Sequence, residues 1–339
     1  MEYKILCIIG EEIEFNIAGK SHPANISDLQ NPENLKRIYR IQFSRQPKKE
    51  YFEIVIDVLK LSPHIDLRFY GNYSEDLIDW KSLIFIERLQ IDLWETKNLK
   101  EIGLLVNLKR LAISKNVKST VSLKILKDLK NLEILFTSIS KDIEIIAELD
   151  KLKFISLREI KTKNLDFLKS LKSLNELWIS FGSYENIDGI SFVENLTKLS
   201  IHQLRGIDNE TLNEVISKCS SLNAIELQNL KFLTSLNFTD KLKNLNYLRL
   251  DKIKNIDTYQ TISKSKSLNT ISTTESRPID KNLIYLKNVE NVLLGDSYQK
   301  SEIEIFLKEF NGKTLWIWGK ELKGKVQTKN PFELILNNA

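Results

Sequence analysis

A short apolar pattern recurs down almost the whole chain. An apolar residue is followed by a second three positions later and by a third two positions after that, as in Leu108, Leu111 and Ile113. The middle residues of thirteen copies are Ile41, Leu67, Leu89, Leu111, Leu135, Ile155, Leu177, Leu199, Ile225, Leu248, Ile271, Val292 and Leu315. Steps of 20–26 residues between them are typical of a solenoid, in which each repeat buries its apolar face against its neighbours.

One repeat, residues 99–135, shows how the pattern folds. Because side chains alternate along a strand, Leu111 and Ile113 are predicted to point into the core, and Arg110 and Ala112 to the opposite face. The apolar residues that follow are spaced by three: Leu126, Leu129, Leu132 and Leu135. This spacing predicts a return through a short helix or 3₁₀ turn with one buried side. Each repeat therefore places a strand on one side and a helical segment on the other.

The register resembles that of the leucine-rich repeat family, and it is closest to the internalin-like short-repeat subclass over about residues 38–318. The resemblance implies an α/β solenoid of about 12–13 irregular repeats. Its parallel β-sheet would form the concave face, and short helices or 3₁₀ turns the convex face. Many family members carry asparagine five residues after the middle position. Asn116 fits, but most equivalent positions differ, namely Ser140, Ile160, Gly182, Leu204, Leu230 and Ile253.

The two ends of a solenoid need caps, because a terminal repeat would otherwise expose a sheet edge and its core. We expect an N-terminal β cap over residues 1–37, the solenoid over 38–318, and a C-terminal cap or tail over 319–339. Strands are predicted near residues 3–9 and 13–17, and helices near 50–61 and 303–310. Within the tail, Phe332, Leu334 and Leu336 are expected to pack on Trp316 and Trp318 of the last strand.

Bulk composition places few limits on function. The chain has 339 residues, 42% of them hydrophobic, and a net charge of +5 that is spread along its length. Two distant cysteines, Cys7 and Cys219, do not indicate a disulfide framework. The first residues lack the pattern of a signal peptide, and no stretch of about 20 apolar residues occurs. We expect a cytoplasmic monomer without a membrane span.

Motifs that carry catalysis are weak or missing. Gly19, Lys20 and Ser21 end like a phosphate-binding loop, but Glu14 stands where its first glycine is needed. The sequence has no His-Glu-x-x-His or Cys-x-x-Cys motif, and its three histidines, His22, His64 and His202, are scattered. We therefore predict a protein that is not an enzyme and needs no cofactor or metal.

The residues one before, one after and three after each middle position are predicted to line the inner, concave face. Large aromatic residues fall in adjacent repeats there, with charged residues around them, as in binding hot spots. The predicted partner-binding residues are Ile134, Phe136, Phe154, Arg158, Glu176, Trp178, Lys198, His202, Tyr247 and Arg249. We expect Phe136, Phe154 and Trp178 to be partly solvent-accessible. Alternatively, irregular loops cover these aromatic residues within the monomer.

The sequence supports two classes of function. The first is a non-enzymatic module that recognises a protein or peptide through its concave face, for example an intracellular inhibitor or immunity-type protein. The alternative is binding of nucleic acid or another polyanion through a basic face. Lysines such as Lys124, Lys127 and Lys130 lie where the outside of a repeat is expected, which favours the first class.

Overall fold

A computed structural model describes residues 4–94, 96–325 and 329–332 of the chain. The chain divides into two compact units, which we call unit 1 (Met1–Lys153) and unit 2 (Phe154–Ala339). Each unit is described by itself. The predicted cap boundaries at residues 37 and 318 stay predictions.

Unit 1 begins with an antiparallel group, β1 (Lys4–Ile9), β2 (Glu12–Ile17) and β3 (Lys20–Pro23), and β1 then pairs in parallel with β4 (Ile38–Phe43). Parallel pairing continues through β5 (Asp66–Gly71), β6 (Arg88–Leu93), β7 (Arg110–Ile113) and β8 (Ile134–Thr137). Its helical segments are η1 (Ile26–Gln30), α1 (Pro32–Leu35), α2 (Lys49–Leu61), η2 (Glu75–Leu77), η3 (Trp80–Leu83), η4 (Lys100–Leu104), η5 (Leu123–Leu126) and η6 (Ile143–Glu148).

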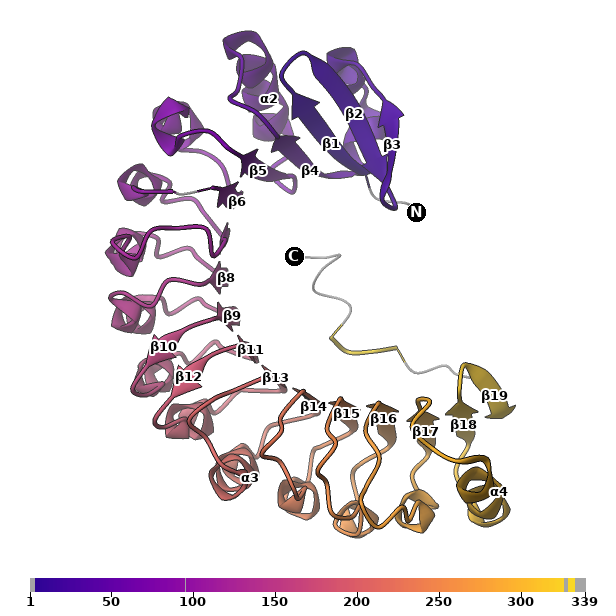
Figure 1. The fold of residues 1–339 in the computed structure, drawn as a ribbon. Coiled ribbons are helices and arrows are strands. Elements are labelled where there is room, and N and C mark those ends of the chain that lie inside the picture. The colour runs from indigo at the N-terminus through magenta and orange to yellow at the C-terminus, as the bar shows by residue number, and fades with distance from the viewer. Residues whose placement is uncertain (1–3, 95, 326–328, 333–339) are drawn as a thin grey trace. The chain divides into compact units, whose positions relative to one another are not determined.

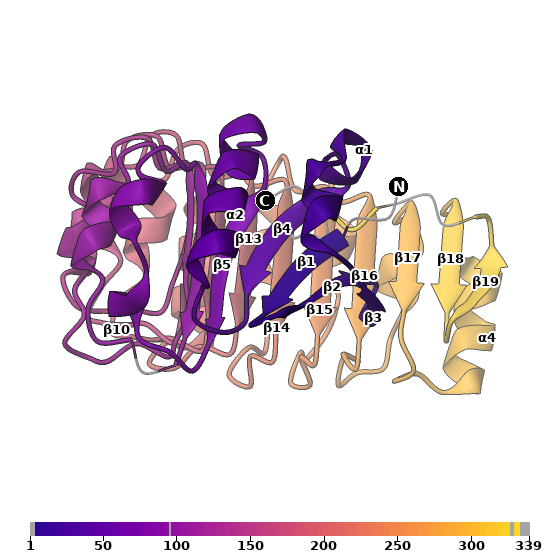
Figure 2. The same cartoon turned by 90° about the horizontal axis from the view of Figure 1, so that it is seen from above.

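Unit 2 is a second run of parallel strands: β9 (Phe154–Arg158), β11 (Glu176–Ser180), β13 (Lys198–His202), β14 (Ala224–Gln228), β15 (Tyr247–Asp251), β16 (Thr270–Thr274), β17 (Asn291–Leu294) and β18 (Thr314–Ile317). The final strand, β19 (Lys320–Lys323), pairs with β18 in antiparallel fashion. A small separate pair joins β10 (Lys161–Thr162) and β12 (Ser183–Tyr184). Figure 2 shows β14–β18 lying side by side.

The return segments of unit 2 are mostly single 3₁₀ turns. They are η7 (Asp166–Ser170), η8 (Asp188–Phe192), η9 (Asn237–Asp240), η10 (Ile262–Lys264) and η11 (Ile284–Leu286), with α3 (Asn209–Lys218) and α4 (Lys300–Glu309) as full helices. In Figure 1 these segments lie across each repeat from its strand. The prediction of strands on one side and short helices or 3₁₀ turns on the other is confirmed.

The predicted register is confirmed at every repeat. All thirteen middle residues lie in strands and have 0% relative exposure. Within each unit they pair with one another from strand to strand, as Leu67 does with Leu89 and Leu177 with Leu199. A buried leucine contributes about 1.5–3 kcal/mol, so the stack of these residues forms the core of each unit.

Several repeats of unit 2 carry an apolar side chain at the position where many leucine-rich repeats have asparagine. The residue four positions after the middle one adopts a left-handed conformation in successive repeats, for example Phe181 (φ 56°) and Lys252 (φ 55°). This turn of the backbone points the next residue inward. Ile160, Leu230 and Ile253 occupy that next position, and each has 0% exposure. Packing of apolar groups therefore takes the place of an asparagine ladder in these repeats.

The elements expected near the two ends are present. Strands β1 and β2 match the predicted N-terminal pair, and α2 and α4 match the two predicted helices to within three residues. None of the described helices is long and apolar enough to cross a membrane.

Candidate functional site

The strand face of unit 2, the sheet surface opposite its core, carries a group of four aromatic residues and one alanine that we call the aromatic patch: Phe154, Trp178, Tyr247 and Phe332, with Ala224. The rings of Phe154 and Trp178 meet edge to face, with centroids 5.3 Å apart and planes at 77°. They come from the neighbouring parallel strands β9 and β11. Such aromatic pairs add about 0.5–1.5 kcal/mol to the effect of burial, so the indole of Trp178 is held in a defined place.

A polar contact fixes the other edge of the indole. Trp178 Nε1 donates a hydrogen bond to Oε1 of Glu176 at 2.8 Å, and Lys198 Nζ lies 3.3 Å from Oε2 of the same carboxylate. Glu176 is 3% exposed. Burial raises the pKa of Glu176, while the ammonium of Lys198 opposes that rise. Trp178 therefore remains partly exposed, yet both its ring and its N–H are anchored.

A segment near the C-terminus lies on the same face. Lys198 Nζ donates to the carbonyl oxygen of Pro331 at 3.0 Å, and the ring of Phe332 lies 6.4 Å from that of Tyr247. Phe332 is buried there with Ala224 and Tyr247, and Trp178 packs against them. The prediction that Phe332 packs on the last strand is wrong. Phe332 and Pro331 lie instead where Tyr247 offers an aromatic ring and Lys198 a hydrogen-bond donor. Leu334 and Leu336 lie outside the described residues.

Charged residues surround the aromatic patch. Arg158 lies over the ring of Phe181 at 5.3 Å, and that ring is 4.4 Å from the ring of His202. Partial burial lowers the pKa of His202, against the influence of Asp251 and other nearby carboxylates. Arg249 Nη1 lies 3.1 Å from Oε1 of Glu226.

The structure places the predicted residues as follows, and their role in binding a partner stays a prediction. In unit 2, Trp178, Lys198, His202 and Arg249 are partly exposed and Arg158 is exposed, on the predicted face. The expectation that Phe154 is accessible is wrong, because it is 4% exposed with Trp178 edge-on against it; Glu176 and Tyr247 are also buried. Ile134 and Phe136 belong to unit 1, where both are partly exposed and Arg110 lies 5.2 Å from the Phe136 ring.

Two residues of this surface were not found by sequence reasoning. Phe181 lies one position beyond the three rows considered, and its left-handed backbone turns it toward His202. Four positions after a middle residue is a spacing that could have identified it. Phe332 reaches Tyr247 from a segment outside the repeats, and no pattern in the sequence indicates that contact. Phe332 supports the view that part of the aromatic patch is covered within the monomer, while Trp178 remains partly exposed.

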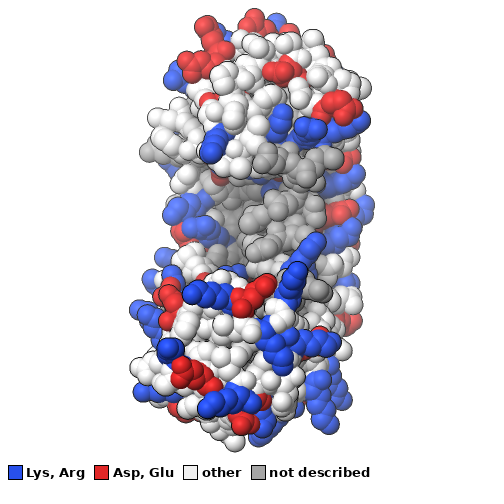
Figure 3. Space-filling view, turned by 90° about the vertical axis from the view of Figure 1, so that its right-hand side faces the viewer, with Lys and Arg blue, Asp and Glu red and all other residues white. Residues whose placement is uncertain are grey.

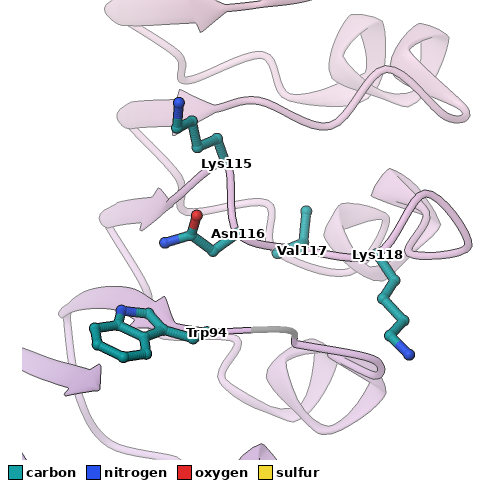
Figure 4. Close-up of a pocket in the computed structure, with 5 residues that line it drawn as sticks. All are labelled: Trp94, Lys115, Asn116, Val117 and Lys118. Carbon is teal, nitrogen blue, oxygen red and sulfur yellow. The ribbon is translucent and has the colours of Figure 1, made fainter. Parts of the chain in front are cut away.

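Unit 1 holds an open pocket of about 530 Å³ beside the ends of β6 and β7. It is lined by Trp94, Lys115, Asn116, Val117 and Lys118. Figure 4 shows that the two lysines point away from the indole and away from each other. The described lining residues include no carboxylate, histidine or cysteine that could form an acid–base or nucleophilic pair. Trp94, at 50% exposure, is a second exposed tryptophan with which Trp178 can be compared.

The described residues include no group of three or more His, Cys, Asp and Glu side chains that could hold a metal ion. Cys7 and Cys219 are buried and form no disulfide. Burial raises the pKa of the Cys219 thiol to about 12, and this thiol donates to the carbonyl of Val215 at 3.3 Å. Cys219 therefore packs as a small core residue.

Comparison with known proteins gives no match to a family model and none to a curated protein. Among solved structures, internalin InlF of Listeria monocytogenes matches at 18% identity and TM-score 0.45, over 86% of this chain and 87% of that one. Internalin C2 of the same species matches at 21% identity and TM-score 0.44, over 58% of this chain and 84% of internalin C2. TLR13, from a complex with ssRNA13, matches at 15% identity and TM-score 0.46, over 79% of this chain and 49% of the TLR13 chain. On the repeat register and strand pairing of its own two units, this chain has the leucine-rich-repeat fold.

Proposed function

We propose that this chain is a non-enzymatic module that binds a protein or peptide through the strand face of unit 2. The observation that carries the proposal is Trp178, a partly exposed tryptophan held by Phe154 on one side and by Glu176 on the other. A large aromatic residue that is already ordered loses little conformational entropy on binding, which is why tryptophan dominates many interfaces.

The surroundings of Trp178 support this proposal. Arg158, Lys198 and Arg249 lie around the aromatic patch with their side chains 28–53% exposed, so an apolar centre has a charged rim. The contact of Pro331 and Phe332 with the same face supports this proposal, because Phe332 places an aromatic side chain against Tyr247 and Pro331 a carbonyl on Lys198. A partner segment with an aromatic side chain would use the same groups.

An inhibitor or immunity-type role, in which the bound face of a partner is blocked, belongs to the same proposal, as does a cytoplasmic location. The two cysteines, neither of which forms a disulfide, are compatible with a reducing compartment.

Binding of a polyanion through a basic face is the second candidate. Many lysines on the outside of the repeats pair with carboxylates, as Lys109 does with Glu87, Lys153 with Glu133, and Lys172 with Glu194. On the side drawn in Figure 3, basic and acidic side chains are interspersed. This arrangement favours protein binding, because a polyanion is held by basic residues gathered on one face.

The test is an affinity capture from a lysate of the source organism, followed by titration of the captured partner. Trp178→Ala is expected to weaken binding by about 2 kcal/mol or more. The variant should stay folded with a modestly lower melting temperature, because it loses the contact with Phe154 and the hydrogen bond to Glu176. Trp94→Ala is the matched control, because it removes an equally large exposed side chain from the pocket in unit 1.

Phe332→Ala is a useful third variant, because it uncovers Tyr247 and is expected to strengthen binding of a partner that uses that ring. The proposal fails if Trp178→Ala and Trp94→Ala bind alike. It also fails if Trp178→Ala melts far below the wild type yet binds equally well once folded, because Trp178 would then be a core residue.

A further inference from the structure

The strand face of unit 1 carries four arginines whose charge is only half balanced. They come from adjacent parallel strands: Arg40 on β4, Arg68 on β5, Arg88 on β6 and Arg110 on β7. The carboxylates that pair with them are Asp66 and Asp92. Among the described residues, four guanidinium groups against two paired carboxylates leave a surplus of two positive charges. We call these six residues the arginine cluster.

Asp66 is shared by three of the arginines. Arg88 Nε lies 2.8 Å from its Oδ1, while Arg40 Nη2 and Arg110 Nη1 each lie 3.2 Å from its Oδ2. Asp66 is 1% exposed. A guanidinium offers five N–H donors in a fixed plane, so one carboxylate cannot satisfy three of them. Buried N–H groups of Arg40 and Arg110 have no hydrogen-bond partner among the described residues.

The like charges lie close together. Arg88 and Arg110 are direct partners in the register of β6 and β7, an arrangement that is unfavourable for like charges. Arg110 is 5% exposed. Burial, together with the neighbouring charges of Arg88 and Arg40, lowers the pKa of Arg110 to about 10, even though Asp66 opposes that change. An anion bound beside Arg110 would offset both its repulsion from Arg88 and Arg40 and the hydration that it loses on burial.

Contacts with neighbouring side chains hold the guanidinium groups of Arg68 and Arg110 in place. Arg68 Nε donates to Asp92 Oδ2 at 2.6 Å and its Nη1 donates to Gln42 at 2.8 Å, while Tyr70 places its ring 4.7 Å from the guanidinium. Arg110 is held over the ring of Phe136. Glu14 on β2 accepts a hydrogen bond from Ser21 and, among the described residues, forms no ion pair with these arginines. The guanidinium planes are therefore fixed before any ligand arrives, which lowers the entropy cost of binding.

We propose that the arginine cluster binds a carboxylate side chain presented by an acidic segment of a partner protein. Arginine pairs with carboxylates through two parallel N–H···O bonds, which suits the fixed planes here. The side chains of Arg40, Arg68 and Arg88 are 15–21% exposed, so a small protruding group reaches them more readily than a polymer backbone does. A nucleic acid needs several phosphate contacts along a basic track, and the neighbouring Lys109 is paired with Glu87. This proposal is independent of Trp178, because the two sites lie in different units.

The probe is a short capped peptide of alternating glutamate and glycine, labelled with a fluorophore and titrated at low salt by anisotropy. The same peptide with glutamine in place of glutamate controls for charge. Arg88→Gln is expected to weaken binding about tenfold or more, because hydrogen bonds to charged groups are lost. Lys109→Gln is the matched control and should bind like the wild type, because it removes a positive charge that Glu87 already pairs.

Asp92→Asn separates a binding role from a purely structural one. Removing that carboxylate increases the surplus charge, so the variant should bind the acidic peptide more tightly than the wild type. If the arginine cluster only holds neighbouring strands together, Asp92→Asn should lower the stability of the protein and leave its binding of the peptide unchanged. Melting curves of each variant establish that it is folded, and Arg40→Gln replaces Arg88→Gln if the latter does not fold.

The proposal is overturned if the wild-type protein does not bind the glutamate peptide, or if Arg88→Gln and Lys109→Gln bind it alike. An oligothymidylate of the same length is the third ligand. If it binds more tightly than the acidic peptide and loses that binding in Arg88→Gln, the cluster is a phosphate site and the partner is a nucleic acid.

Discussion

At the residue scale, His202 is the group whose surroundings give the protein a pH dependence. It stacks near Phe181, and partial burial lowers its pKa below the ordinary value of about 6.5. The folded state therefore binds a proton less readily than the unfolded chain. By linkage, the stability that comes from neutral His202 is present above about pH 6.5 and is lost as the pH falls through the lower pKa of the folded state.

We therefore expect the wild type to lose more stability between about pH 7.5 and 5.5 than His202→Gln, which keeps a polar side chain but does not titrate. Urea unfolding at several pH values measures this difference. Glu176, whose pKa is raised by burial, contributes with the opposite sign, but it is present in both proteins, so the difference between their curves reports His202. Parallel curves for the two proteins would contradict the expectation.

The sequence predicted which residues are buried better than which surface residues meet. Burial of Leu111, Leu177 and Leu248 follows from a local pattern that every repeat shares. Trp178 was correctly placed on the strand face by alternation, but the hydrogen bond of its N–H to Glu176 depends on the rotamers of both side chains. Phe332 contacts Tyr247 across 85 residues of sequence, and no periodicity links the two.

At the element scale, the step of 26 residues between Leu199 and Ile225 corresponds to a longer return segment, the helix α3. Asp208 caps this helix by accepting from Thr211 N at 2.8 Å. Two asparagines then tie the helix to the next repeat. Asn209 Oδ1 accepts from the backbone N–H groups of Thr234 and Ser235, each at 3.0 Å. These bonds satisfy the backbone of a loop that forms no strand.

Asn213 carries the buried part of this connection. Its Nδ2 donates to the carbonyl oxygens of Asn209 and Ser235 at 2.9 and 3.1 Å, and its Oδ1 accepts from the N–H of the buried Phe238 at 3.2 Å. Asn213→Ala leaves these backbone groups unpaired and is expected to cost about 1–3 kcal/mol, although alanine is the better helix former.

Glu214→Ala is the control for Asn213→Ala, since Glu214 is the next residue of α3 and forms an exposed pair with Lys218. Exposed pairs of this kind contribute about 0.5 kcal/mol or less. Chemical unfolding of both variants gives the comparison. An equal loss in the two would show that the buried amide does not hold α3 to the following loop.

At the scale of the whole molecule, the buried middle residues of the repeats are alike, whereas the residues on the strand faces differ between the two units. The core rows are uniform, since every middle residue is apolar and fully buried. The strand faces differ, with an aromatic patch in unit 2 and an arginine cluster in unit 1. A core that repeats leaves the outward-facing positions open to variation, because those side chains do not determine whether the next repeat can stack.

Nearest-neighbour stacking also predicts where damage to the core is felt. Leu177→Ala opens a cavity in a fully buried position and is expected to cost about 2–5 kcal/mol. Since each repeat contacts mainly its neighbours, amide exchange should quicken most in β9, β11 and β13 and should stay slow in β4–β6. Leu89→Ala in unit 1 should give the reverse pattern. Equal acceleration in all strands for both variants would mean that the chain opens as one cooperative body rather than repeat by repeat.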